Sequence, residues 1–317
     1  MKGGHILART PRRWRNFSVH CEVRRTVDRQ FLLLPTPEVR NIIGACLGRA
    51  LEKFPVRLHW ADANVNHLHI GRSALPEKTQ NLSQFNQHFY SLLSRELNRL
   101  WDREGPVWSS RVRSREAIDD HSLERQLFYS VTNMVKDGLV DKVTHSKGFS
   151  CYSSLASGKT EKYWFYDRTA WWKQGGPLGR LPLSTFRRWV EVQFEPIANW
   201  ENLPTHKWQA HFRREVRRIE QAERANRELE ERRVMSAVKL AKLDPRARPK
   251  TRNIRTKQPL CHASDMGLVA DYKKEWQAFL DAFYRASEQF LSGNYHVEFP
   301  DGSFRPPLVS LYTASAL

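Results

Sequence analysis

The sequence contains no long hydrophobic run and no closely spaced cysteines. A membrane-spanning helix needs about 18 consecutive apolar residues, and no segment is that long. The basic start, MKGGHILARTPRRWRNF, has no apolar stretch after it, so we expect no secretory signal peptide. Cys21, Cys46, Cys151 and Cys261 form no Cys-x-x-Cys pair, which argues against a zinc knuckle or a disulfide framework. We therefore expect a cytoplasmic protein with no membrane partner.

Acidic residues are scarce relative to basic ones. The 317 residues include 52 Lys and Arg but only 34 Asp and Glu, which gives a net charge of +18 and a pI near 10.0. So large a surplus repels itself in the free protein, so a polyanionic partner is expected, and nucleic acid is the first candidate. An anionic membrane surface comes second, because a basic membrane binder should also show an apolar anchor.

The first half of the chain alternates between two hydrophobic periods. A period of two predicts strands, and a helical period predicts helices between them. The expected strands are 17–24, 56–60, 66–71 and 107–115, and the expected helices are 37–51, 82–101 and 123–135, the last closing at Gly138. Because one pair of strands is joined by a tight hairpin, we predict an α+β fold, an antiparallel sheet with packed helices.

The composition changes after about residue 155, which predicts domains at 1–155 and 156–317. The second region is expected to be basic and mainly helical, with no assigned role. It is predicted to hold one long polar helix over 206–242, an exposed basic linker over 246–257 and a last helix around 272–283. The aromatic cluster at 163–172 either fills a core, which we favour, or stacks on unpaired bases.

Two histidines stand two residues apart on a predicted strand. His67 and His69 should therefore project from one face, while Leu68 and Ile70 point toward a core. Paired imidazoles bind a divalent cation, and such a cation polarises a phosphate oxygen. Alone, such a pair is more often an ordinary surface or hairpin pair of histidines than a metal site.

A tyrosine and an asparagine lie one helical turn apart in the YSVTN segment. Tyr129 and Asn133 are predicted to fall roughly opposite the apolar arc of their helix. A phenol attacks phosphorus, and an amide oxygen four residues further on completes a metal site.

The order of these motifs resembles that of the single-tyrosine HUH transposases, most closely the REP-associated tyrosine transposases. Asn66–His69 match the Asn-His-hydrophobic-His strand, and Gly105 with Trp108 match the Gly-x-x-Trp strand. The tyrosine motif is matched by Tyr129, Asn133, Val135, Lys136, Gly138, Leu139 and Val140, and the closing serines by Ser153 and Ser154. The resemblance covers residues 15–155. Val65 and Met134 stand where prolines are usual.

The resemblance implies an HUH fold with a ferredoxin-like palm and a DNA-cutting chemistry. His67 and His69 would bind Mg²⁺ or Mn²⁺, with Asn133 as third ligand. Tyr129 would attack the scissile phosphate of single-stranded hairpin DNA, giving a 5′-phosphotyrosine link. A domesticated hairpin-DNA-binding protein without transposition is the alternative, and an HUH relaxase or replication initiator a weaker one. The protein is a possible homodimer.

Basic residues supply the expected DNA contacts. Arg111, Arg113 and Arg115 alternate on a predicted strand and should share one face, as phosphate contacts or as a solvated surface. The linker is the stronger candidate, because no acidic residues compensate its charge. The full predicted set is Arg111, Arg113, Arg115, Lys136, Arg246, Arg248, Lys250 and Arg252.

Overall fold

Four antiparallel strands form the central sheet of the computed structural model, which describes residues 10–76, 78–250 and 259–305. The strands are β1 (Val19–Arg25), β2 (Arg57–Asn64), β3 (His67–Ser73) and β4 (Arg113–Ala117), in the order β2-β3-β1-β4. Helix α1 (Pro37–Lys53) connects β1 to β2, and α2 (Gln80–Leu100) connects β3 to β4. This order makes two interlocked βαβ units, the ferredoxin-like arrangement. The predicted α+β fold class is confirmed.

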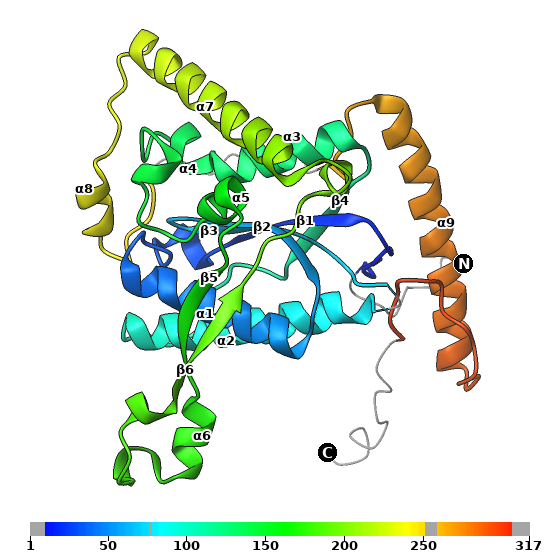
Figure 1. Cartoon of the computed structure of the whole chain (residues 1–317). Helices are drawn as coiled ribbons and strands as arrows, with labels where there is room; N and C mark the ends of the chain where they lie inside the picture. Colours follow the sequence, from blue (N-terminus) through cyan, green and yellow to red (C-terminus); the bar gives the residue numbers. More distant parts are fainter. Residues whose placement is uncertain (1–9, 77, 251–258, 306–317) are drawn as a thin grey trace.

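The two faces of the sheet are covered by different helices (Figure 1). Helices α1 and α2 pack on one face, where Leu68 and Ile70 are completely buried with Phe85 and Phe89. Helix α3 (Asp120–Val131) and the short α4 (Asn133–Lys136) lie on the other face. Alternation along β3 therefore sends the apolar residues to α1 and α2 and the histidines to the α3 face.

Local sequence explains where the helices on the sheet begin. Thr36 caps α1 by accepting a hydrogen bond from the Val39 amide at 3.3 Å, and Pro37 occupies the first helical position. Asp119 caps α3 in the same way through the Ser122 amide at 2.8 Å. These caps satisfy amides that have no partner within the helix.

The segment after residue 155 begins with a β-hairpin that the sequence reading missed. Strands β5 (Glu161–Tyr166) and β6 (Arg187–Val192) pair with each other, and their inner half packs on α1. Gly44 allows this contact, because a Cβ there would lie 2.4 Å from the Tyr163 ring. The outer part, with α6 (Arg168–Lys173), projects away from the sheet (Figure 1).

Three further helices follow, and they differ from the predicted ones. Helix α7 (Thr205–Leu229) is followed by a break and by α8 (Ala237–Ala241), so the single predicted helix over 206–242 is wrong. The fully buried apolar residues of α7 end at Val216, but the helix continues to Leu229 and Arg227 is buried near its end. The chain then leaves helical geometry at Glu231, which adopts a positive φ of 52°. The last helix, α9 (Met266–Leu291), is longer than the predicted 272–283, because Asp265 caps it.

Shorter elements complete the described chain. Helix α5 spans Tyr152–Ser157 and packs against α7. Short 3₁₀ turns lie at Val27–Arg29, Val143–His145, Gly176–Leu178, Leu183–Phe186 and Ala198–Trp200. Within the described ranges, no helix is both long and apolar enough to cross a bilayer.

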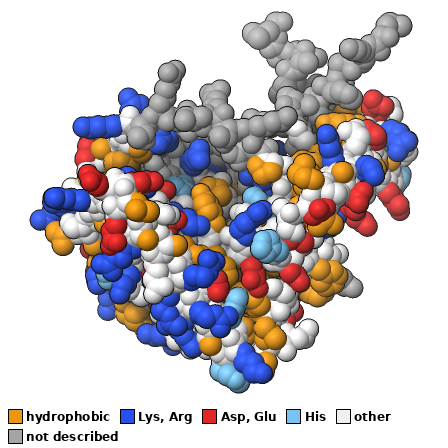
Figure 2. Space-filling view, turned by 90° about the horizontal axis from the view of Figure 1, so that it is seen from above, with side chains coloured by type: hydrophobic (Ala, Val, Ile, Leu, Met, Phe, Trp, Pro, Cys, Tyr) orange, Lys and Arg blue, Asp and Glu red, His pale blue; other side chains and the backbone are white. Residues whose placement is uncertain are grey.

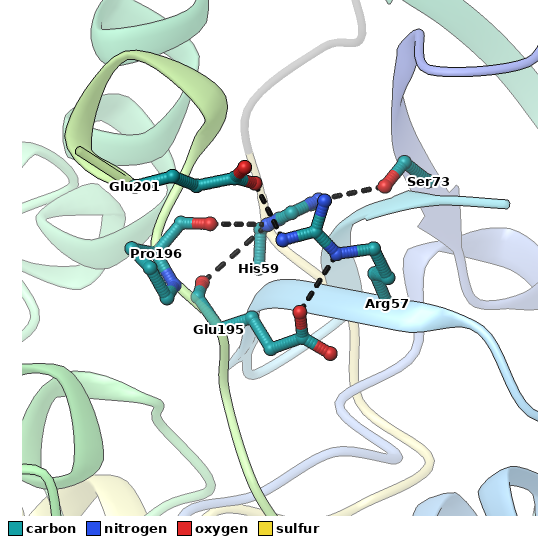
Figure 3. A network of polar contacts seen from close by, with 6 residues as sticks. All are labelled: Arg57, His59, Ser73, Glu195, Pro196 and Glu201. Atoms are coloured by element: carbon teal, nitrogen blue, oxygen red, sulfur yellow. Dashed lines mark hydrogen bonds and ion pairs between the residues drawn. The ribbon is translucent and has the colours of Figure 1, made fainter. Parts of the chain in front are cut away.

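A polar network joins the chain after β6 to the sheet (Figure 3). Buried His59 on β2 uses both ring nitrogens, Nδ1 at 3.0 Å from the Pro196 carbonyl oxygen and Nε2 at 2.9 Å from Ser73 Oγ. Arg57 forms ion pairs with Glu195, at 2.7 Å, and with Glu201. Because Nδ1 faces a carbonyl oxygen, it carries the proton and Nε2 accepts from the serine. Residues on both sides of position 155 thus share one set of contacts.

Candidate active site

Strand register places the two histidines side by side. His67 on β3 lies opposite Asn64 on β2 and Arg25 on β1, and His69 lies opposite Asp62 and Val23. Residues directly opposite each other in an antiparallel pair share a face. The His67 and His69 ring centroids are 4.9 Å apart, on the face that α3 covers.

The tyrosine helix is interrupted between its two predicted functional residues. Helix α3 ends at Val131, and Thr132 leaves helical geometry with φ −95° and ψ 7° while its Oγ1 donates to the Phe128 carbonyl at 2.6 Å. Asn133 begins the separate α4. Tyr129 is 42% exposed, as predicted, but Asn133 is only 4% exposed and turned toward the sheet. The prediction of both residues opposite the apolar arc of one helix is therefore wrong for Asn133.

The break lets all four residues converge. The Tyr129 ring meets the His69 ring edge-on at 5.6 Å between centroids. Asn133 Oδ1 lies 2.9 Å from His67 Nε2. A tyrosine on α3, an asparagine on α4 and two histidines on β3 thus form one cluster.

The amide of Asn64 determines which atom Asn133 presents. Asn64 Oδ1 accepts a hydrogen bond from the Val65 amide at 2.6 Å, so its Nδ2 is the group that faces outward. That Nδ2 donates to Asn133 Oδ1 at 2.5 Å and to Asp137 Oδ2 at 2.8 Å. An acceptor is therefore required at the Asn133 position, and the oxygen, not the nitrogen, is directed at His67.

His67 is held in a single tautomer by a second asparagine. Asn66 Nδ2 donates to the Arg29 carbonyl at 3.3 Å, so the Asn66 Oδ1 atom faces His67 Nδ1 at 2.8 Å. Because Oδ1 can only accept, the proton of the neutral His67 ring lies on Nδ1. Burial lowers the pKa of His67 to about 4, so the ring is neutral at pH 7 and Nε2 keeps its lone pair.

Two electron-pair donors consequently face each other in the cluster. His67 Nε2 and Asn133 Oδ1 are 2.9 Å apart with no proton to share between them. Buried His69 also has an Nε2 without a partner in the described structure. Burial lowers the pKa of His69 well below its usual value, so this ring is neutral too. Two imidazole nitrogens and one amide oxygen fit a divalent cation, and a second ring N–H bound to an oxygen is usual for a ligating histidine.

The third ligand of this candidate metal site is an amide oxygen, rather than a carboxylate or another histidine. Across residues 10–76, 78–250 and 259–305, no group of three or more His, Cys, Asp and Glu is arranged to hold a metal. The candidate site therefore consists of His67, His69 and Asn133.

Three charged residues lie near Tyr129: Arg25 and Asp137, which the sequence did not indicate, and Lys136, one of the predicted DNA contacts. Burial, followed by the charge of Asp137, raises the pKa of the Tyr129 phenol, whereas Arg25 and a hydrogen bond with Asn133 act against that rise. Lys136 Nζ lies 5.0 Å from the centre of the Tyr129 ring. Arg25 and Lys136 thus place positive charge next to the phenol.

A buried carboxylate lies behind His69. Asp62 accepts hydrogen bonds from Ser150 Oγ at 2.5 Å and Cys151 Sγ at 3.2 Å, and burial raises its pKa to about 6. Asp62, His69 and Asn133 line a cavity of about 20 Å³. That volume holds one water molecule.

Asn64 and Asp62 escaped prediction for the same reason. The DANVN segment was read only as a turn, although Asn64 is the residue paired with His67 across the β2–β3 hairpin. A period of two continued backward from the histidines through that tight hairpin would have placed Asn64 and Asp62 on the same face.

The predicted strand arginines do not all share a face. Strand β4 begins at Arg113, so Arg111 precedes it, and the expected three-residue row is wrong. Arg113 and Arg115 do lie on the histidine face, opposite Val23 and Cys21. Arg115 Nε donates to the Pro259 carbonyl at 2.7 Å, which ties part of this guanidinium to the protein itself.

The predicted basic linker lies only partly in the described structure. Arg246, Arg248 and Lys250 are exposed, whereas Arg252 lies outside the described residues. The Ala247 carbonyl accepts from the Phe31 amide at 3.0 Å, so this segment runs beside the loop between β1 and α1. Lys and Arg side chains are scattered over the face seen in Figure 2, with Asp and Glu among them, rather than gathered in one stripe.

Comparisons with known proteins gave likenesses in structure alone. No protein-family model matches the sequence, and no curated protein matches it. A REP-associated tyrosine transposase bound to a REP hairpin matches 48% of this chain and 87% of its own, with 14% identity and a TM-score of 0.39. A candidate transposase from Deinococcus radiodurans R1 matches 38% and 95%, with 13% identity and a TM-score of 0.28. Both are of the class that the sequence resembles, but the likeness is distant, so function has to be inferred from the site.

Proposed function

We propose that this chain is a transposase-type strand transferase that cuts and rejoins single-stranded DNA through a covalent link to Tyr129. The observation that carries the proposal is the convergence of Tyr129 and Asn133 on the neutral pair His67 and His69. Such a cluster combines a nucleophile that is accessible to a large substrate with ligands for Mg²⁺ or Mn²⁺.

The residues of the chain divide the chemistry between them. A divalent ion bound by His67, His69 and Asn133 would offset the charge of the scissile phosphate. Tyr129 Oη forms a bond to phosphorus while the bond from phosphorus to the 3′-oxygen breaks. The phenol proton passes to solvent, and the leaving oxygen takes up a proton to become a 3′-OH. One phosphodiester bond replaces another, so a 3′-OH can attack the 5′-phosphotyrosine and reverse the step.

Burial and the charge of Asp137 raise the pKa of the Tyr129 phenol, so attack by this tyrosine depends on groups that offset the rise. Arg25 and Lys136 stand close to the ring, and phenolate formation is helped by positive charge nearby. Asn64 and Asn66 take no part in bond breaking. They hold the Asn133 oxygen and the His67 lone pair in the orientation that a cation requires.

Single-stranded DNA with a hairpin is the proposed substrate. Arg113 on the histidine face and the exposed Arg246, Arg248 and Lys250 would contact its phosphates, and Arg252 is included from the sequence. Tyr129 is exposed on one side, which allows an unpaired strand to reach it.

The test compares Tyr129→Phe with Tyr295→Phe, a variant of another half-exposed tyrosine. With Mg²⁺ or Mn²⁺, the wild type and Tyr295→Phe should nick a hairpin oligonucleotide and become covalently attached to its 3′ portion. Tyr129→Phe should bind the oligonucleotide with unchanged affinity and form no adduct. His67→Ala with His69→Ala should abolish nicking without a loss of fold.

Two results would contradict the proposal. Full nicking in EDTA would remove the metal from the mechanism. Tight hairpin binding with no adduct by the wild type, over many hairpins and both metals, would instead support the binding protein without transposition.

A further inference from the structure

A group of arginines lies on the sheet face opposite the histidines. Arg24 on β1 is paired with Leu68, which places it on the α1 and α2 face. Its Nε donates to the Ser110 carbonyl at 3.3 Å. Arg12, in the segment before β1, donates to the Val112 carbonyl at 3.2 Å. Both guanidinium groups thus meet the loop that enters β4, where Arg111 also lies.

Aromatic rings position these guanidinium groups. The Arg24 Cζ atom lies 4.2 Å from the centre of the Tyr90 ring and 5.1 Å from that of Trp108. The Arg12 Cζ atom lies 6.0 Å from the centre of the Trp14 ring. Stacking on aromatic rings fixes a guanidinium and leaves N–H groups at its edge for planar oxygen acceptors.

The buried carboxylate of Glu22 offsets only part of the positive charge of Arg12 and Arg24. Burial first, and then Arg111, Arg72 and Arg24, lower the pKa of Arg12 to about 10, and only Glu22 acts in the opposite direction. Glu22 itself is fully buried, and its Oε1 atom accepts from both Arg72 at 2.6 Å and Asn86 at 2.9 Å, which leaves Oε2 without a hydrogen-bond partner among the described residues.

The adjacent basic residues contrast with this group. Arg15 forms ion pairs with Glu116 at 2.9 Å and Glu275 at 2.7 Å, and Arg13 lies 3.7 Å from Glu275. Arg12 and Arg24, by contrast, donate to carbonyl oxygens and lie against aromatic rings. Carbonyl oxygens orient a guanidinium but do not cancel its charge. Guanidinium groups held near one another repel, and an anion bound to them offsets that repulsion.

We propose that Arg12 and Arg24, together with Arg111, bind consecutive phosphates of the DNA at the β4 edge, on the face opposite the histidines. The choice of DNA as the anion rests on the function proposed above. Arg113 and Arg115 lie across the same edge on the other face, so the two groups line one path around β4. A strand cut at Tyr129 would be held on both sides of the sheet.

The experiment measures binding without cleavage. Affinity for a hairpin oligonucleotide is determined in EDTA by fluorescence anisotropy over a series of salt concentrations, for the wild type, Arg12→Gln with Arg24→Gln, and Arg180→Gln. Arg180 is exposed at the tip of the β5–β6 projection and serves as a control for the loss of charge. Counterion release is about 0.7 per contacted phosphate for single strands, so the double variant should lower the salt slope by roughly 1.4. Its affinity should fall about tenfold, as expected for losing charged hydrogen bonds.

A second measurement covers the case in which the double variant does not fold. In the wild type, bound oligonucleotide should shield Arg12 and Arg24 from phenylglyoxal, read by mass spectrometry, and leave Arg180 reactive. An unchanged salt slope in a folded double variant, or equal modification with and without DNA, would overturn the proposal. Because both measurements are made in EDTA, an absence of nicking by the wild type would refute the proposed cleavage and not this site.

Discussion

Arg227 offers a direct test of how the second half of the chain supports the candidate site. It lies on α7 with its side chain 5% exposed, and it reaches the short α4 helix. Its Nη1 donates to the Val135 carbonyl at 3.1 Å and its Nη2 to Asp141 at 2.8 Å. The Val135 carbonyl lies within α4, the element that carries Asn133.

Replacing Arg227 by Met keeps the length of the side chain and removes both interactions. Breaking a buried ion pair costs about 3–5 kcal/mol. The Asp141 side chain is 29% exposed, so water recovers part of its hydration, and we expect a loss of about 2–3 kcal/mol. For a protein of this size, that loss lowers Tm by roughly 3–5 °C.

A neighbouring arginine provides the matched control. Arg224 pairs with Glu228 at 3.3 Å, and both side chains are more than 60% exposed. Arg224→Met should therefore change the free energy of unfolding by at most about 0.5 kcal/mol. Calorimetry and urea unfolding measure both variants.

The position of Asn133 gives a second readout. If α4 loosens without Arg227, folded Arg227→Met should need more Mn²⁺ for half-maximal nicking than the wild type, whereas Arg224→Met should not. Equal melting temperatures for the two variants, or a lowered Tm with an unchanged Mn²⁺ requirement, would refute this account of α7.

Two further predictions concern buried polar residues. Asn64→Ala should weaken Mn²⁺ binding by about 10–100-fold, because the Asn133 oxygen loses its orientation. Asn81→Ala, on the surface of α2, should leave Mn²⁺ affinity unchanged. Electron paramagnetic resonance measures both affinities, and equal values would disprove the orienting role of Asn64. Burial lowers the pKa of His59 to about 4. Between pH 6.5 and pH 4, the His59 ring therefore takes up a proton in the unfolded chain but not in the folded one. The free energy of unfolding should fall over this range by roughly 1.4 kcal/mol per pH unit from this residue. Urea unfolding at pH 7 and pH 5 should show a smaller loss for His59→Gln than for exposed His145→Gln, and an identical loss would contradict the assignment.

The sheet and its histidine pair were predictable because strand alternation is a local property. His67 and His69 stand two apart, and no distant contact is needed to place them on one face. The strand order also follows once helices are expected between β1 and β2 and between β3 and β4, since short crossovers leave few topologies.

Asn133, the proposed third ligand, could not be placed in this way. The apolar pattern runs without interruption from Leu123 to Met134, so it predicts one helix. At the break, the Thr132 hydroxyl group donates to the Phe128 carbonyl, and Asn133 just after it contacts Asn64 and His67 on the sheet. Side-chain bonds of this kind compete with helix geometry, and the sequence pattern does not reveal which will prevail.

The second half was the least predictable part. Its hairpin is made from aromatic residues that serve equally as core or as strand, and Trp164 and Trp189 stack across it at 3.5 Å between ring centroids. The proposed boundary at 155 stays a prediction. Trp208 and Phe212 are buried in the same core as α3, so a truncation at residue 155 would remove them and expose the part of the core that they cover.

The contact between α7 and α4 also concerns the order in which the protein is made. The strands and both histidines leave the ribosome early, and Tyr129 follows soon after them. Phe128 stacks on Phe212, and Arg227 bonds to α4, so the outer side of the tyrosine helix is completed only by residues synthesised much later. Interrupted synthesis would release the sheet with its proposed nucleophile but without this support. In such an arrangement, the proposed cutting site is complete only in a completed chain.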